Sequence, residues 1–105
     1  MDRATHESLK RIAERLKREC GAQKVILYGS YARGEETADS DIDLLVIIPT
    51  TDRMIDRMTK VRRAIRDLRN GLPISPVVLT PKELEDRLEA GDSFVRAVIE
   101  EGIAL

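Results

Sequence analysis

The stretch Leu27–Ile48, LYGSYARGEETADSDIDLLVII, decides the fold that this sequence predicts. It links two apolar runs, Lys24–Tyr28 (KVILY) and Asp41–Ile48 (DIDLLVII), through a polar, glycine-containing segment. Short apolar runs that end at Gly or Pro are typical of buried strands. Ser30–Arg33 directly follows the first run and stops at Gly34, which favours a short helix. The stretch therefore predicts a strand, a short helix, a polar loop and a second strand.

Two amphipathic helices and a third strand are expected around this centre. Apolar residues at spacings of three and four predict helices over 3–20 and 51–68. A third strand is predicted over 74–80 and contains Pro76. Because proline has no amide hydrogen to give to a neighbouring strand, it favours an edge position or a bulge.

The C-terminal third predicts two more helices. Thr80, Pro81 and Glu83 are the residue types that favour an N-cap, a first helical position and the third position of a capping box. They predict a helix over 81–90, and a last short helix is expected over 93–101. The order of elements predicts an α/β domain of two or three layers.

Composition narrows the class of protein. The 105 residues predict one domain over 1–105. The sequence has 18 Lys or Arg against 19 Asp or Glu. Because it has no Trp and one Phe, the core is expected to be aliphatic. A single Cys and a single His exclude an internal disulfide and a Cys/His metal cluster. No apolar run resembles a membrane helix or a signal peptide, which predicts a cytoplasmic protein with no membrane contact. The chemistry must then come from carboxylates, hydroxyls and backbone groups.

Asp41 and Asp43 are the first candidate site residues. Residues two apart in a strand share a face, so their carboxylates are expected side by side. Two adjacent anions repel, and a divalent cation between them relieves that repulsion. Oxygen ligands without His or Cys favour Mg²⁺ or Mn²⁺ over zinc.

Gly29 and Ser30, at the junction of strand and helix, are candidates for binding a phosphate. Glycine allows close approach of the backbone, while the free amides at a helix start favour an anion. Arg33 either reaches the same phosphate or forms a surface ion pair. A phosphate turn and a carboxylate pair in one segment predict metal-assisted phosphoryl or nucleotidyl transfer.

Gly29–Gly34 (GSYARG) and Ser40–Leu44 (SDIDL) together resemble the signature of the DNA polymerase β-like nucleotidyltransferase superfamily. The chain's size resembles the minimal nucleotidyltransferase branch, often found beside HEPN-domain proteins in toxin–antitoxin pairs. The resemblance implies a small mixed sheet flanked by helices, as in the polymerase β-like palm. It also implies an NTP, ATP first, with its phosphates on Gly29 and Ser30 and with Mg²⁺ on Asp41 and Asp43. A nucleoside monophosphate would pass to a hydroxyl, in that branch a tyrosine of the HEPN toxin.

The sequence departs from the family pattern at the third strand. The pattern has a third carboxylate there as general base, yet no Asp or Glu lies between Gly71 and Thr80. Strand register makes Ser75 the matching residue, and a neutral hydroxyl is a poor metal ligand and a poor base. Three alternatives stay open: a weak transferase, a base from a partner, or a nucleotide-binding antitoxin that blocks its partner by occlusion. Transfer to a small-molecule hydroxyl is a further alternative.

The charges are unevenly distributed. Thr51–Asn70 holds seven basic and three acidic residues, whereas Gly71–Leu105 holds three basic and seven acidic ones. The basic helix is either an ion-paired, solvated face or a surface for nucleic acid or an acidic partner. It lacks the interleaved aromatic residues of a single-strand binder. The apolar residues after Ser93 are expected to close the core or to form an interface, including one between copies of the chain.

Overall fold

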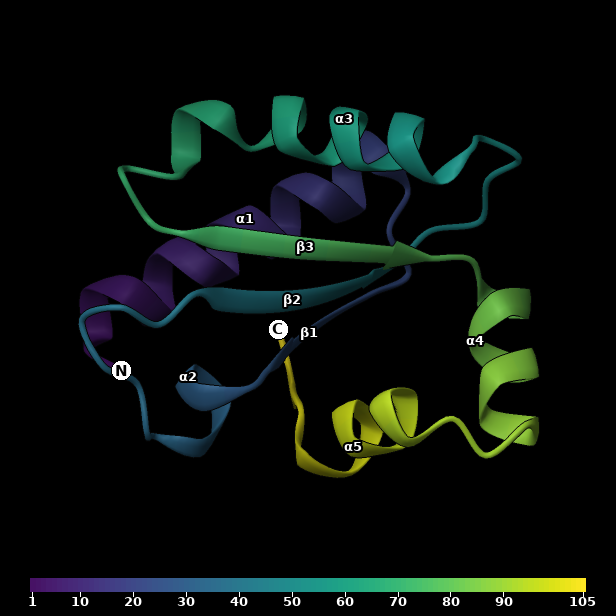
Figure 1. The fold of residues 1–105 in the computed structure, drawn as a ribbon. Coiled ribbons are helices and arrows are strands. Elements are labelled where there is room, and N and C mark those ends of the chain that lie inside the picture. The colour runs from purple at the N-terminus through teal and green to yellow at the C-terminus, as the bar shows by residue number, and fades with distance from the viewer.

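The computed structural model describes all 105 residues and contains one four-stranded sheet in the order β3-β2-β1-β4 (Figure 1). Strand β1 (Lys24–Tyr28) runs antiparallel to β2 (Ile42–Ile47) and to β4 (Ile103–Ala104). Strand β3 (Ile74–Leu79) runs parallel to β2. The predicted α/β class, with a small mixed sheet flanked by helices, is therefore confirmed.

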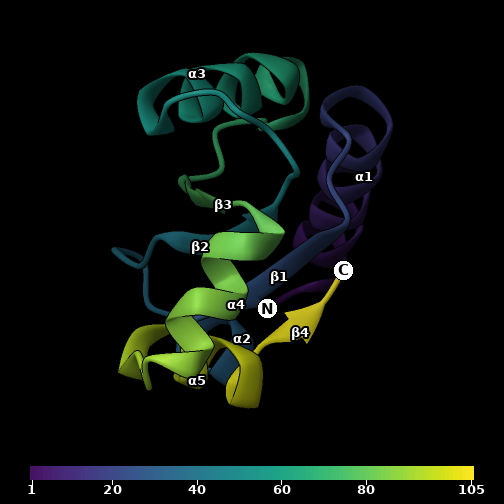
Figure 2. The same ribbon diagram turned by 90° about the vertical axis from the view of Figure 1, so that its right-hand side faces the viewer.

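Helices cover both faces of the sheet. They are α1 (Arg3–Cys20), α2 (Ser30–Arg33), α3 (Met54–Ala64), the 3₁₀ turn η1 (Arg66–Leu68), α4 (Pro81–Glu89) and α5 (Ser93–Glu101). Figure 2 shows α1 and α3 on one side of the sheet, with α4 and α5 on the other. None of them has both the length and the apolar composition needed to cross a lipid bilayer.

Strand β2 divides the core into two layers. Leu44 and Val46 belong to the larger apolar cluster, which contains the buried residues of α1 and α3. Leu45 and Ile47 belong to the smaller cluster, with the buried valines of α5. Because side chains alternate along a strand, Asp43 lies on the same face as Leu45, toward α5. The fold thus directs one carboxylate to the side that α5 partly covers.

Side-chain caps fix three of the helix starts. The Asp2 carboxylate accepts from the Thr5 amide at 2.7 Å, and the Asp92 carboxylate accepts from the Val95 amide at 3.0 Å. Thr80 and Glu83 exchange side-chain and backbone hydrogen bonds in a full capping box. The predicted start of the helix after Thr80 is therefore confirmed.

Helix α3 is shorter than the predicted helix over 51–68. It begins at Met54, because the Asp52 carboxylate accepts from Lys60 Nζ at 2.6 Å instead of capping the first amides. It ends before Ile65, whose φ of −107° and ψ of 5° leave the helical range, and continues as the turn η1. The helical pattern in the sequence spans both pieces because Val61 of α3 and Leu68 of η1 both contact the larger apolar cluster.

The two edges of the sheet differ. The carbonyls of Pro73 and Leu79 accept from the amides of Ile42 and Ile48, so alternate residues of β3 turn their backbone toward β2. The backbone of Pro76 therefore points away from β2, toward the outer edge of the sheet, which is the position that the sequence predicts for it. Strand β4 at the other edge was not predicted, because two residues are too short to show a strand pattern.

Some of the C-terminal apolar residues close the core, one of the two predicted roles. Val95 and Val98 are buried, whereas Phe94, Ile99 and Ile103 are partly exposed. Gly102 lets the chain turn from α5 into β4, because a Cβ there would collide with Ile26 Cγ2 and with the Val98 carbonyl. Close packing, rather than an unusual φ, therefore demands glycine at this position.

Candidate functional site

The predicted carboxylate pair lies at the start of β2. Asp43 is half-buried on the α5 face, and Asp41 is exposed just before the strand. Burial raises the pKa of Asp43, the charge of Asp41 raises that pKa further, and Arg33 lowers it. The electrostatic coupling between the two carboxylates therefore matches the repulsion expected from their spacing.

Gly29 brings the backbone turn against one of these carboxylates. Its φ of 76° and ψ of −155° belong to a region that is essentially restricted to glycine. A Cβ at this position would lie 2.5 Å from Asp43 Oδ2. The turn and the carboxylate are therefore in contact.

The first turn of α2 presents the predicted phosphate-binding groups. The amides of Ala32 and Arg33 donate to the Gly29 carbonyl at 3.1 and 3.2 Å. The amides of Ser30 and Tyr31 precede the point at which an intrahelical acceptor becomes available. Ser30 is partly buried directly after Gly29, so its hydroxyl and two amides border the carboxylates.

Arg33 is occupied by acidic partners. Its guanidinium lies 3.1 Å from Glu35 and 3.6 Å from Glu101, and the hydrogen bond to Glu35 is the main cause of its raised pKa. All three side chains are largely exposed, where such pairs contribute little to stability. The structure thus realises the ion-pair alternative for Arg33 while keeping it close enough to influence Asp43.

Ser75 lies opposite Asp43 in the parallel pair β2–β3, the register that the sequence predicts. It is partly buried, and β3 contains no acidic residue. Nowhere in the chain do three or more His, Cys, Asp or Glu side chains gather in a metal-binding group. The site therefore has two carboxylates and a neutral hydroxyl.

Tyr28 lies beside the site, although its place in the apolar run Lys24–Tyr28 is typical of a core residue. It pairs with Asp43 across the antiparallel β1–β2 ladder. Burial raises the pKa of its phenol, and the charge of Asp43 raises that pKa further. The Tyr28 ring meets Phe94 edge to face, with ring centroids 5.4 Å apart. Both contacts arise from the tertiary fold, and no local pattern in the sequence indicated either of them.

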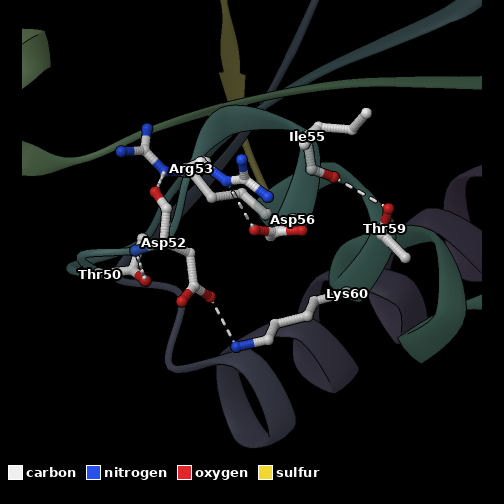
Figure 3. A network of polar contacts seen from close by, with 8 residues as sticks. Thr50, Asp52, Arg53, Ile55, Asp56, Thr59 and Lys60 are labelled. Carbon is white, nitrogen blue, oxygen red and sulfur yellow. Dashed lines mark hydrogen bonds and ion pairs between the residues drawn. The ribbon is translucent and has the colours of Figure 1, made fainter.

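The basic helix α3 is partly ion-paired. Figure 3 shows Lys60 on Asp52 and Arg53 on Asp56, at 2.6 and 3.4 Å. Arg57 pairs with Glu83 at 2.6 Å. Arg62, Arg63 and Arg66 are exposed and have no acidic partner within the chain. Attraction of nucleic acid or an acidic partner by this face stays a prediction.

A cavity of about 410 Å³ lies beside α3, lined by Ile48 and Pro49 after the end of β2. Asp41 and Asp43 mark the opposite end of that strand. Of the cations that line the cavity, Arg57 and Lys60 are neutralised by Glu83 and Asp52. The cavity is therefore separate from the carboxylate site.

Comparison with known proteins agrees with this geometry. A candidate protein adenylyltransferase of Methanocaldococcus jannaschii is 38% identical over 84 residues, which cover 79% of this chain and 77% of that protein. A second one from the same organism is 43% identical over 63 residues, 57% of this chain and 43% of that protein. The crystal structure of a candidate nucleotidyltransferase from Sulfolobus solfataricus aligns with 99% of this chain and 87% of its own, at a TM-score of 0.55 and 25% identity. Residues 9–105 match the model of the nucleotidyltransferase domain, and the chain belongs to that family.

Proposed function

We propose that this protein binds ATP with Mg²⁺ or Mn²⁺ and transfers its nucleoside monophosphate to a hydroxyl of a partner protein. The observation that carries the proposal is the contact between Gly29 and Asp43, where a Cβ would lie 2.5 Å from the carboxylate. It joins a turn suited to phosphate with a carboxylate suited to a cation. Family membership supports nucleotidyl transfer as the class of reaction.

The donor set of the site fits a hard divalent cation. Asp41 and Asp43 offer carboxylate oxygens, with no Cys or His in a shared cluster. Two carboxylates leave room for phosphate oxygens and water, the usual partners of Mg²⁺. Bound there, Mg²⁺ or Mn²⁺ would neutralise phosphate charge and the repulsion from Asp41 that, together with burial, raises the pKa of Asp43.

The remaining residues bind and orient the donor. The Ser30 hydroxyl and the first amides of α2 would hold the outer phosphates. Arg33 would add a cation by exchanging Glu35 and Glu101 for a phosphate, since both pairs are exposed. The acceptor oxygen then forms a bond to the α-phosphorus, the bond to pyrophosphate breaks, and the acceptor proton passes to a base.

We propose a protein acceptor because two relatives are named as candidate protein adenylyltransferases. The resemblance to the minimal branch adds a HEPN-domain partner with an acceptor tyrosine, and an antitoxin role in the cytoplasm. A partner also supplies what the chain lacks, since Ser75 cannot act as the general base.

Calorimetric titration of the protein with ATP and Mg²⁺ tests the proposal. Saturable binding is expected, and Asp41→Asn with Asp43→Asn should abolish its dependence on the metal. Asp39→Asn, an exposed aspartate of the preceding loop, is the matched control and should bind as the wild type does. Absence of binding with all four NTPs would contradict the proposal.

A second candidate function is neutralisation of the same partner by occlusion, without catalysis. The neutral Ser75 opposite Asp43 is the observation that favours it. Mass spectrometry of a HEPN-domain partner after incubation with ATP and Mg²⁺ separates the two candidates. A gain of one adenylate supports transfer, whereas inhibition of an unmodified partner supports occlusion. Replacing both aspartates by Asn should remove the first effect and leave the second.

A further inference from the structure

Two of the three aromatic rings in this chain meet beside the carboxylate site. The rings of Tyr28 and Phe94 cross at 82°, with centroids 5.4 Å apart. Such an edge-to-face pair leaves a face of one ring available to a third partner. Phe94 is 38% exposed although it adjoins the buried Val95, so its ring is the accessible one.

The pair begins next to Asp43. Tyr28 and Asp43 are directly opposite in an antiparallel ladder, where Cβ atoms are about 4.5–5.5 Å apart. Phe94 contacts Tyr28, so one side chain separates its ring from Asp43. An exposed aromatic face this near to a phosphate and metal site is a candidate platform for the base of a nucleotide.

The fold holds both rings in position. Tyr28 is the last residue of β1, and Phe94 lies in the first turn of α5, which Asp92 caps through the Val95 amide. Val95 and Val98 anchor that helix in the smaller apolar cluster. A ring fixed in this way loses little further freedom when a planar ligand stacks on it.

The third aromatic residue is not part of this surface. Tyr31 packs against the larger apolar cluster, which lies on the other face of the sheet. Exposed aliphatic residues such as Ile99 offer no π-face. Phe94 is therefore the one exposed ring that borders the site.

We propose that Phe94, supported by Tyr28, is the platform on which the base of the bound nucleotide stacks. The inference rests on the proposed function, because it takes the phosphates to be held at Gly29 and Asp43. Stacking uses a π-face that every base has, so it tolerates all four bases. A purine covers more of the ring than a pyrimidine, so ATP and GTP should bind more tightly than CTP and UTP.

Comparison of ATP with inorganic tripolyphosphate, each titrated with Mg²⁺, isolates the base. Phe94→Ala should weaken ATP binding roughly tenfold, the scale of one base–aromatic stack, and leave tripolyphosphate binding unchanged. Phe94→Tyr should keep the affinity for ATP. Ile99→Ala is the matched control, because Ile99 lies on the same helix but lines a separate hollow beside Lys24 and Leu105. It should change neither affinity.

A second readout comes from fluorescence. The chain has no Trp, so its emission arises from Tyr28 and Tyr31, and Tyr31→Phe isolates Tyr28. ATP should quench this emission in the Tyr31→Phe protein, and tripolyphosphate should leave it unchanged.

The outcomes distinguish the two proposals. Phe94→Ala with wild-type affinity for ATP, or with equal losses for ATP and tripolyphosphate, would overturn the stacking platform while the proposed function stands. Failure of the wild type to bind either ligand would overturn the proposed function and the platform with it.

Discussion

Asp43 and Ser75 are direct partners in the parallel ladder between β2 and β3, and both side chains lie on the α5 face. The half-buried carboxylate therefore has a neutral hydroxyl on the neighbouring strand, where the polymerase β-like pattern has another acid. That arrangement spares the metal-free protein a third negative charge, and it leaves the site without an internal base.

Restoring an acid at this position is expected to increase activity. Ser75→Asp should raise the rate of nucleotidyl transfer about 10²-fold or more in the presence of Mg²⁺, the scale of general base catalysis. It should also lower the free energy of unfolding without metal, because a third carboxylate adds repulsion. Transfer assays and urea denaturation with and without Mg²⁺ measure the two effects.

Ser75→Asn is the control for this change, since it has the size of aspartate without its charge. It should increase neither the transfer rate nor the stabilisation by Mg²⁺. An equal response of the Asp and Asn variants would contradict the assignment of Ser75 to the third position.

The raised pKa of Asp43 predicts a pH-dependent stability. The folded state binds this proton more tightly than the unfolded chain does, so stability falls as pH rises from the ordinary aspartate pKa through the raised one. Asp43→Asn should therefore increase the free energy of unfolding at pH 7. The gain should disappear below about pH 4, where the wild-type carboxyl is protonated as well.

Glu83→Gln should show the opposite sign. Arg57 lowers the pKa of Glu83, chiefly through a side-chain hydrogen bond, so its ionised form stabilises the fold above the ordinary glutamate pKa. Removal of that charge should destabilise the protein at pH 7, with the loss fading in acid. Urea denaturation of both variants between about pH 3 and pH 8 measures these two changes in stability. A loss of stability by Asp43→Asn at pH 7 would contradict the prediction.

Gly29 and Gly34 separate the effect of close contact from that of backbone strain. Both have positive φ, but only at Gly29 would a Cβ collide with Asp43. Gly34→Ala should cost about 1 kcal/mol of stability, the usual penalty for a left-handed residue, and leave ATP binding intact. Gly29→Ala should cost about as much or more and also weaken ATP·Mg²⁺ binding more than tenfold, because Asp43 must move. Equal affinities for the two variants would show that the contact is unimportant.

Gly102→Ala tests the packing of the last helix on the sheet. The added methyl collides with Ile26 and with the carbonyl of Val98, so the expected destabilisation is about 1–3 kcal/mol. The loss should appear as a lower urea midpoint. An unchanged midpoint would mean that the backbone at the turn into β4 shifts to accept the methyl group with no loss in the free energy of unfolding.

Local signals explain what could be predicted from the sequence. Thr80 and Glu83 specify a capping box within four residues, and the apolar run after Asp41 specifies strand β2. Pro76 indicated an edge because a residue without an amide hydrogen cannot donate to a neighbouring strand in any sheet. These features depend only on neighbours in the chain.

Contacts between distant residues explain what could not be predicted. The pairing of Tyr28 with Phe94 joins β1 to α5 through the tertiary fold. Helix α3 starts late because Asp52 binds Lys60, eight residues on, in place of the helix amides. Strand β4 exists because β1 offers a free edge at Leu27 and Gly102 lets the chain approach it.

Pro76 has a consequence for how this sheet meets other chains. Its missing amide hydrogen lies in the middle of the outer edge of β3, so a fifth strand from another chain would find no donor at the centre of the ladder. The β3 edge is thereby protected against intermolecular strand addition and the aggregation that follows from it. Growth of the sheet by another chain is left to the side of β4.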